Sequence, residues 1–416
     1  MIENKYLYHF AMFLLSIYPI SGYYETSIGF TVGQLLLFFF IVICILIYGA
    51  NRVFCFPKFY YFFWTYTAIA LLITQNSFKI TNLVPGGINF FTWSLCLGMG
   101  IVFFKYDLFK KYMKCVFGIC TIVFVAQEIM HMRTGVRFSA ILPISDYFYG
   151  GSTSYFELTS RHSIGSRSPS LFIEPAYFAQ YTLILLSLML FDSYRNYLRS
   201  DYIIIISAIL VLVFLKSGCG IIGLIYIFIY KIISLYKDKG GIKFLLLLFL
   251  ILPFVIYFVQ LYFSSDIGVS MVERQDEFYN EDSGSSAYTR VVRGFQIYGF
   301  MPFVNQVFGI STDDMFAISA ANGMPLERNV LATNGFQRVL IQNGIIGLFI
   351  LFCFYIRLLK YNKTRLASAL LGLLFVFSLM ESVYLSPDML IMTIIIATEY
   401  KNCKEFNTLR KLPLPR

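Results

Sequence analysis

Charged residues are scarce in this chain. Asp, Glu, Lys and Arg make up 13% of its 416 residues, whereas a soluble globular protein carries about 25%. Hydrophobic residues account for 58%, and the mean hydropathy is +0.70. Because a soluble domain of this length needs more polar residues to cover its surface, the composition excludes that class and predicts a membrane protein.

The chain also lacks the residues that several kinds of functional site require. Its eight cysteines avoid the two long polar segments defined below, which excludes a disulfide scaffold or a thiolate metal site there. None of the three histidines has a partner at metal-ligand spacing. No Walker motif, phosphate-cradling glycine-rich loop or nucleophile elbow occurs, so we expect neither a nucleotide-driven reaction nor a metal or cofactor.

Long apolar runs are what the sequence has instead. They predict an all-α polytopic membrane protein, one integral membrane domain over residues 1–416 with about twelve transmembrane helices. The first 24 residues lack a basic n-region and a cleavage site, so their apolar stretch is predicted to be the first span. The expected spans are 6–21, 30–49, 59–77, 86–104, 112–131, 173–191, 201–216, 219–236, 243–263, 336–356, 366–381 and 385–400.

Lysine and arginine concentrate in alternate connections between these spans, which predicts that both termini are cytoplasmic. The net charge of +10 follows from this bias, and nucleic acid is not expected as a partner. Two connections on the outer side are too long for simple turns: residues 132–171, called here the first loop, and 264–335, the second loop. Their aromatic residues favour short packed helices over disorder.

Both loops lack lysine but contain several arginines. A guanidinium binds phosphate or carboxylate through a planar fork, so the arginines suggest an anion site on the outer face. The simpler alternative is that they pair with acids of the loops. The arginines of the loops and the adjoining helix edge are Arg133, Arg137, Arg161, Arg167, Arg274, Arg290, Arg293, Arg328 and Arg338.

Two short patterns stand out in these loops. Arg290 and Arg293 are three residues apart, which places both on one face of a short helix, suited either to a polyanion or to nearby loop acids. Glu174 precedes Pro175, so it is predicted to lie at the N-terminus of the sixth span, where the helix dipole keeps its carboxylate ionised. It is either a general base beside Arg167 or an acid that caps the helix.

Other acids are also candidates. Ionisable groups in membrane spans are costly and often functional, but those near helix ends are less so. Glu128 and Glu381 are expected on the outer side, where they could join the same site, whereas Glu399 is expected to be structural. The acidic residues of the second loop suit a solvated surface better than a cation site. The four acids in or beside predicted spans are Glu128, Glu381, Asp388 and Glu399.

Three segments resemble conserved elements of bacterial O-antigen and capsule repeat-unit polymerases (the Wzy type). The segment from Arg167 to Glu174-Pro175 resembles their signature at the end of the first large loop. Residues 215–221 resemble their Ser/Gly hinge. Residues 334–348, which begin Asn-Gly-Phe and include Gly344, resemble the element that follows their second large loop.

This resemblance implies a metal-independent, membrane-embedded glycosyltransferase of the bacterial inner membrane. Its donor and acceptor would be oligosaccharide repeat units linked to undecaprenyl pyrophosphate, and a chain-length regulator is a further implied partner besides the bilayer. Arginines would stabilise the charge that develops on the departing pyrophosphate. The residues assigned to this site are Glu174, Arg167 and Arg290 for catalysis, and Arg290, Arg293, Arg161, Arg338, Asn334 and Tyr177 for substrate binding.

Two alternatives accompany this interpretation. O-antigen ligases have a similar architecture and transfer finished glycan to lipid A core, but they usually carry histidine where this chain has Thr333. A lipid-linked oligosaccharide flippase belongs to a different class and needs a charged cavity through the bundle. The charges here gather at one edge of the predicted bundle instead.

Overall fold

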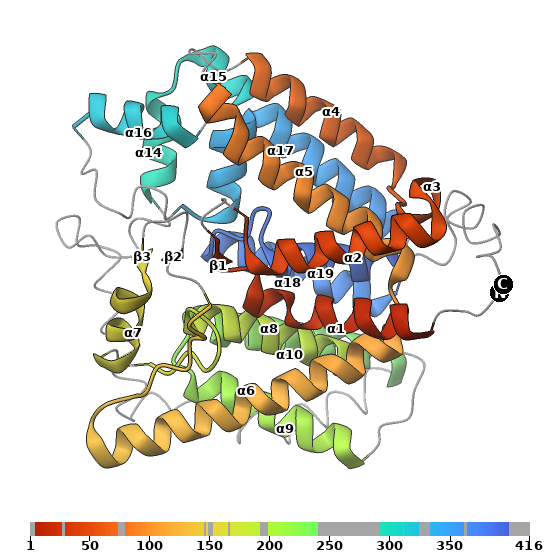
Figure 1. Ribbon diagram of the computed structural model, residues 1–416, viewed down its shortest axis with the longest axis vertical. Helices are drawn as coiled ribbons and strands as arrows, with labels where there is room; N and C mark the ends of the chain where they lie inside the picture. The colour runs from red at the N-terminus through yellow and green to blue at the C-terminus, as the bar shows by residue number, and fades with distance from the viewer. Residues whose placement is uncertain are drawn as a thin grey trace.

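The structure is a computed structural model, and its elements are shown in Figure 1. It describes residues 5–26, 30–73, 80–144, 147–148, 153–164, 167–191, 199–239, 292–310, 312–323, 333–361 and 364–398. The described chain is mostly helical, as the apolar runs predict.

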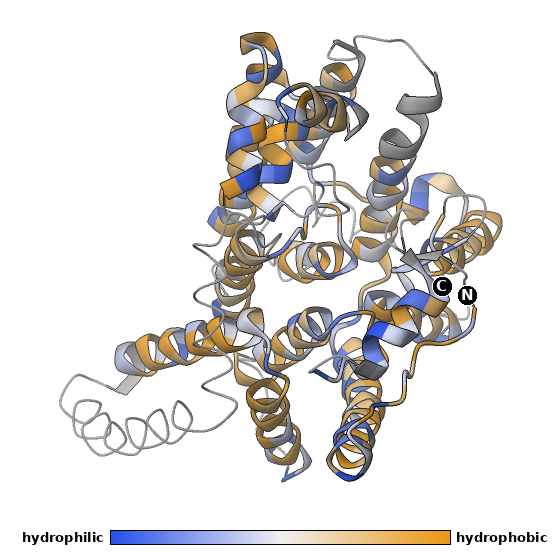
Figure 2. Ribbon diagram, turned by 90° about the vertical axis from the view of Figure 1, so that its left-hand side faces the viewer, coloured by the Kyte–Doolittle hydropathy of each residue, from blue (hydrophilic) through white to orange (hydrophobic). Residues whose placement is uncertain are grey.

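Helices occupy all the expected spans except 243–263, which lies outside the described residues. Three of them, over Tyr106–Thr134, Gly218–Tyr236 and Gly335–Lys360, are long and apolar enough to cross a membrane, and several shorter apolar helices accompany them. Figure 2 shows how strongly hydrophobic residues dominate these helices. The helices are α1 (Lys5–Ser21), α2 (Val32–Tyr48), α4 (Lys58–Ile73), α5 (Ile80–Phe103), α6 (Tyr106–Thr134), α8 (Pro175–Leu190), α9 (Arg199–Phe214), α10 (Gly218–Lys239), α17 (Gly335–Tyr361), α18 (Arg365–Met380) and α19 (Pro387–Thr398).

The described parts of both long loops contain short helices, as the aromatic residues predict. In the first loop this is α7 (Tyr155–Ile164); the second loop has α14 (Gly294–Phe300), α15 (Phe303–Phe308) and α16 (Thr312–Ala321). A further short helix, α3 (Ala50–Val53), follows α2. In Figure 1, α7 and α14–α16 lie at one end of the molecule, on the left, and α3 lies at the other.

A small antiparallel sheet departs from the all-helical expectation. It consists of β1 (Tyr24–Glu25), β2 (Tyr147–Phe148) and β3 (Thr153–Ser154), in the order β1-β2-β3. Tyr24 is paired with Phe148, so the sheet joins the α1–α2 connection to the first loop. Strands of two residues have no alternating pattern that a sequence could reveal.

Two of the most deeply buried helices are α8 and α19. Nearly every residue of each is buried. Helix α8 packs against α6, α9, α10, α18 and α19, while α19 also contacts α1 and α5. Both helices begin with proline, a residue suited to the first helical turn because its missing N–H has no partner there.

A kink at Gly344 divides α17. Gly344 has φ 65° and ψ −177°, a conformation that favours glycine. A Cβ atom there would lie 2.1 Å from the Val307 carbonyl oxygen, so the backbone of α15 approaches α17 directly. Tyr66 fixes the kink, since its hydroxyl donates a hydrogen bond to the Asn343 carbonyl (2.9 Å).

Candidate functional site at the N-terminus of α8

Glu174 occupies the N-cap position of α8, as predicted. Its backbone is extended, and its carbonyl accepts hydrogen bonds from the N–H groups of Tyr177 and Phe178 (3.2 and 3.4 Å). The side chain does not cap the helix, and within the described chain the half-buried carboxylate has no hydrogen bond or ion pair. The structure therefore does not support a capping role. A carboxylate left available at a helix N-terminus is suited to accept a proton from a bound group.

His162 of α7 holds the residue that precedes Glu174. Its Nε2 lies 2.7 Å from the Ile173 carbonyl oxygen, which only accepts, so Nε2 carries the proton. Nδ1 then accepts a hydrogen bond from the Ser139 hydroxyl (3.3 Å). Burial lowers the pKa of His162, while the hydrogen bond to Ile173 and the charge of Glu174 oppose this shift. The neutral imidazole thus links the first loop to the start of α8.

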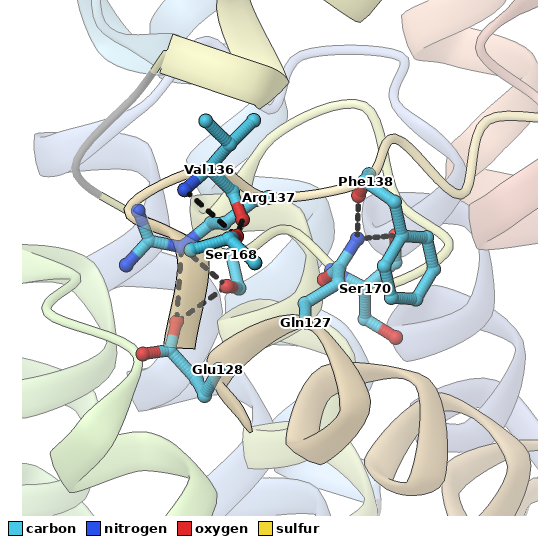
Figure 3. A network of polar contacts seen from close by, with 8 residues as sticks. Gln127, Glu128, Val136, Arg137, Phe138, Ser168 and Ser170 are labelled. Carbon is cyan, nitrogen blue, oxygen red and sulfur yellow. Dashed lines mark hydrogen bonds and ion pairs between the residues drawn. The ribbon is translucent and has the colours of Figure 1, made fainter. Parts of the chain in front are cut away.

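A second polar network, shown in Figure 3, attaches the first loop to the end of α6. The buried Arg137 donates from Nε to the Ser168 hydroxyl (2.8 Å) and forms an ion pair with Glu128 (3.3 Å). Ser168 in turn donates to the Glu128 carboxylate. Ser170 and Gln127 continue the network, with the Ser170 N–H donating to Gln127 Oε1 (2.9 Å).

These contacts favour the simpler alternative for two of the loop arginines. Arg137 is paired with Glu128, and Arg161 is exposed and paired with Glu157 on the preceding turn of α7 (2.7 Å). Neither of the two paired guanidiniums is free for an anion in this conformation. The role of Arg161 in substrate binding remains a prediction from the resemblance.

Arg338 lies in the first turn of α17 and is linked to the start of α8 through Tyr177. Its Nη1 donates to the Ser382 hydroxyl (3.0 Å), and its charge interacts electrostatically with the Tyr384 and Tyr177 hydroxyls. Because Tyr177 is one turn into α8 from Glu174, Arg338 belongs to the same end of the molecule as this carboxylate. No described carboxylate forms an ion pair with Arg338.

Asn334 caps α17. The Gln337 N–H donates to Asn334 Oδ1 (2.9 Å), and the Asn334 N–H donates to Gln337 Oε1 (3.2 Å). This reciprocal pair satisfies backbone N–H groups that a helix N-terminus otherwise leaves free. The structure therefore gives Asn334 a structural role, and its predicted contact with substrate remains a prediction.

Arg293 begins α14 next to the same turn of α17. A Cβ atom at Gly294 would lie 2.4 Å from Gln337 Oε1, so α14 packs directly on the turn that Asn334 caps. Arg293 is buried, and its guanidinium has no hydrogen bond or ion pair with any described residue. A buried guanidinium without a carboxylate partner is suited to bind an anion.

Five of the predicted residues are therefore linked, directly or through Gln337, where the N-termini of α8, α14 and α17 meet, called here the α8–α17 site: Glu174, Tyr177, Arg338, Asn334 and Arg293. The half-buried Arg167 adjoins Ser168 of the Arg137 network. Arg290 lies outside the described residues. Among those that are described, His, Cys, Asp and Glu form no group of three that could hold a metal ion.

Sequence reasoning missed Tyr23 and left Asp388 without a role. The Tyr23 ring is stacked on Tyr177, with ring centroids 4.2 Å apart and an angle of 13° between the planes. The Tyr23 hydroxyl donates to Asp388 Oδ2 (3.4 Å). Only tertiary packing brings α1, α8 and α19 together, so local sequence holds no signal for this pair. An acid in a predicted span indicates a functional residue, so the sequence pointed to Asp388. It did not indicate that Tyr23 is the partner of Asp388.

Comparison with known proteins does not assign the chain to a family. No protein-family model and no curated protein matches the chain.

Proposed function

We propose that this protein polymerises oligosaccharide repeat units linked to undecaprenyl pyrophosphate into O-antigen or capsular polysaccharide. One observation carries most of the support. Glu174, whose carboxylate has no partner among the described residues, precedes Tyr177 by one helical turn, the Tyr177 hydroxyl interacts electrostatically with Arg338, and Arg293 lies beside the same end of α17. The site thus offers a base and two cations that no described carboxylate neutralises, which is what transfer of a glycosyl group from a pyrophosphate requires.

The proposed reaction uses these residues in two roles. Glu174 takes the proton of a hydroxyl on the acceptor unit as the oxygen attacks the anomeric carbon of the donor chain. The bond between this carbon and the pyrophosphate oxygen breaks, and undecaprenyl pyrophosphate leaves with the electron pair. Arg293 and Arg338, together with Arg290 and Arg167, stabilise the charge that develops on the leaving group. The pyrophosphate supplies its own activation, so the proposal involves no metal or nucleotide.

The proposal places the protein in the bacterial inner membrane, with about twelve spans and both termini in the cytoplasm. Support comes from the apolar helices and from the concentration of lysine in alternate connections. The α8–α17 site then faces the periplasm, where lipid-linked repeat units are assembled into polymer. Exposed apolar residues on the long helices are compatible with a polyprenyl chain alongside them.

The test is incubation of the purified protein, in lipid nanodiscs, with undecaprenyl-pyrophosphate-linked repeat unit. We expect a ladder of longer saccharides on a gel and release of undecaprenyl pyrophosphate. Transfer to lipid A core instead of a ladder identifies a ligase. Movement of the lipid-linked unit across vesicle membranes without a new glycosidic bond identifies a flippase. Either of these results overturns the polymerase proposal.

A further inference from the structure

Asp388 is a buried carboxylate that the proposed reaction does not use. It lies in the first turn of α19 and is fully inaccessible to solvent. Its Oδ2 accepts the hydrogen bond from Tyr23, and its Oδ1 has no partner in the described part of the chain. No described cation pairs with it. An acid buried in this way is costly, so its retention calls for a role.

The stacked pair of Tyr23 and Tyr177 connects Asp388 to the α8–α17 site. Tyr23 contacts Asp388 through its hydroxyl and Tyr177 through its ring. Burial raises the pKa of Tyr23 well above its usual value, and the negative charges of Asp388 and Glu174 add to this shift. Both carboxylates therefore lie near one phenol, which stays protonated and remains a donor to Asp388.

The orientation of this pair differs from that of ordinary tyrosines in a membrane protein. Tyrosines at a membrane interface direct their hydroxyls toward water and headgroups. Tyr23 instead directs its hydroxyl inward, to a carboxylate with no exposure. Neighbouring Tyr18 and Tyr181 are core residues, almost fully buried, whereas Tyr23 and Tyr177 both remain partly accessible. The two stacked rings therefore differ from the core tyrosines in being only partly buried, and Tyr177 lies one helical turn from Glu174.

We propose that Tyr23 and Tyr177 form a saccharide-binding wall next to Glu174, and that Asp388 is the residue that positions it. Sugar rings present C–H groups that pack against aromatic faces, and a tyrosine loses little side-chain entropy when it binds. Asp388 holds Tyr23 through its hydroxyl, and Tyr23 supports Tyr177 from one side. This inference rests on the proposed function for the identity of the saccharide, a lipid-linked repeat unit.

Trp93 offers a way to measure binding without turnover. Its Nε1 donates to the Ser386 carbonyl (3.3 Å), two residues before Asp388. The chain has only two tryptophans, so Trp64→Phe leaves Trp93 as the single reporter. Its fluorescence can be titrated with two probes: undecaprenyl-pyrophosphate-linked repeat unit, and undecaprenyl pyrophosphate alone. The second probe lacks the saccharide and controls for the fold and the anion site.

In this background we expect Tyr177→Leu and Asp388→Leu to raise the Kd for the lipid-linked repeat unit about tenfold. Their Kd for undecaprenyl pyrophosphate alone should stay within about twofold of the parent. Asp388→Asn keeps an oxygen that accepts from Tyr23, so we expect it to bind both probes like the parent. If Asp388→Asn binds the lipid-linked repeat unit like the parent and Asp388→Leu does not, the hydrogen bond from Tyr23 to residue 388 positions the pair.

The possible outcomes separate this inference from the proposed function. Equal weakening for both probes, or no weakening in either Leu variant, overturns the saccharide wall. If the parent binds the lipid-linked repeat unit and forms no polymer, the polymerase proposal fails, and the variant Kd values still decide the inference. If the parent binds neither probe, both proposals are overturned.

Discussion

Two acids at the same end of the molecule differ in what surrounds them. Glu128 is neutralised by Arg137 and accepts a hydrogen bond from Ser168, so its charge is used to attach the first loop. Glu174 has neither kind of partner among the described residues, although it lies only a few residues beyond the same network. Glu128 thus has a structural role, whereas Glu174 keeps a carboxylate that can accept a proton from a bound group.

Replacement of Glu174 by glutamine tests its role as the base. Glutamine has the same size but cannot accept the proton, and the backbone of the helix start is kept. We expect chain extension to fall by about 100-fold or more, because a general base contributes that much, with insertion in the membrane unchanged. Glu157→Gln is the matched control, since Glu157 pairs with Arg161 on the surface of α7. Near-normal polymer from Glu174→Gln would remove Glu174 from the reaction.

Arg290→Ala is expected to abolish chain extension as well, because we assign Arg290 to the leaving pyrophosphate. Arg137→Ala provides a contrast, since Arg137 is occupied by Glu128 and Ser168. In that variant the main effect should be lower thermal stability. Polymer yield normalised to folded protein separates the two effects. Equal yields per folded molecule from Arg290→Ala and the parent would contradict the assignment.

His162 gives the site a predicted pH dependence. In the folded protein burial lowers the pKa of His162 below its ordinary value of about 6.5, so the unfolded chain binds the proton more readily. Stability from the neutral imidazole is therefore present above pH 6.5 and is lost as the pH falls from that value through the lower pKa of the folded protein. Protonation also removes the lone pair of Nδ1 that accepts from Ser139.

We expect the thermal midpoint of the parent to fall by about 1–3 °C between pH 7.5 and 5.5 relative to that of His162→Gln. Glutamine donates to the Ile173 carbonyl but does not titrate, so it is the appropriate reference. Scanning fluorimetry in detergent over this pH range measures the difference. Parallel curves for the two proteins would show that His162 does not couple proton binding to the fold.

At the scale of elements, the apolar runs predicted where helices lie, and Glu174-Pro175 predicted where α8 begins. The break between α9 and α10 at Lys216, which has φ 53°, matches the predicted hinge. The sequence gives no comparable information on the three short strands or on the stacking of Tyr23 with Tyr177, because both depend on segments that are far apart in the chain. Candidate residues were thus predictable individually, while their neighbours were not.

The kink at Gly344 was not predicted either, because an isolated glycine in an apolar run fits a straight helix equally well. Gly344→Ala should destabilise the protein, since φ 65° strains alanine and its Cβ would collide with the Val307 carbonyl. We expect a thermal midpoint lower by several degrees and polymer yield reduced at least about tenfold, because α15 must move away from α17.

Gly118→Ala is the matched control for this substitution. Gly118 lies inside α6, and a Cβ atom there would meet nothing within 4 Å. Alanine favours helix, so the control should be as stable as the parent or more stable by up to about 1 kcal/mol. Equal melting of the Gly344 and Gly118 variants would show that the kink is not required.

At the scale of the whole molecule, four arginines of the lysine-free loops and the adjoining start of α17 fall into two groups. Arg137 and Arg161 are paired with acids, whereas Arg293 and Arg338 have no carboxylate partner among the described residues and lie at the α8–α17 site. Topology disfavours arginine and lysine alike on the outer side. Topology therefore accounts for the absence of lysine, but the arginines that are present need a specific reason. For Arg137 and Arg161 this reason is the ion pair that each forms. Anion binding is the corresponding reason for the second group.

Anion binding by these arginines on the outer side requires a particular orientation of the protein, which single cysteines can test. Helices α3 and α7 lie at opposite ends of the molecule in Figure 1, and we expect α3 in the cytoplasm and α7 in the periplasm. Phe156 and Arg52 are both exposed, so Phe156→Cys and Arg52→Cys report on the two sides. The exposed Cys115, and Cys403 near the C-terminus, must first be changed to serine. In cells with a permeable outer membrane, a maleimide that cannot cross the inner membrane should label Phe156→Cys, but label Arg52→Cys only after lysis. The opposite pattern would place the α8–α17 site on the cytoplasmic face, and a periplasmic polymerase would be excluded.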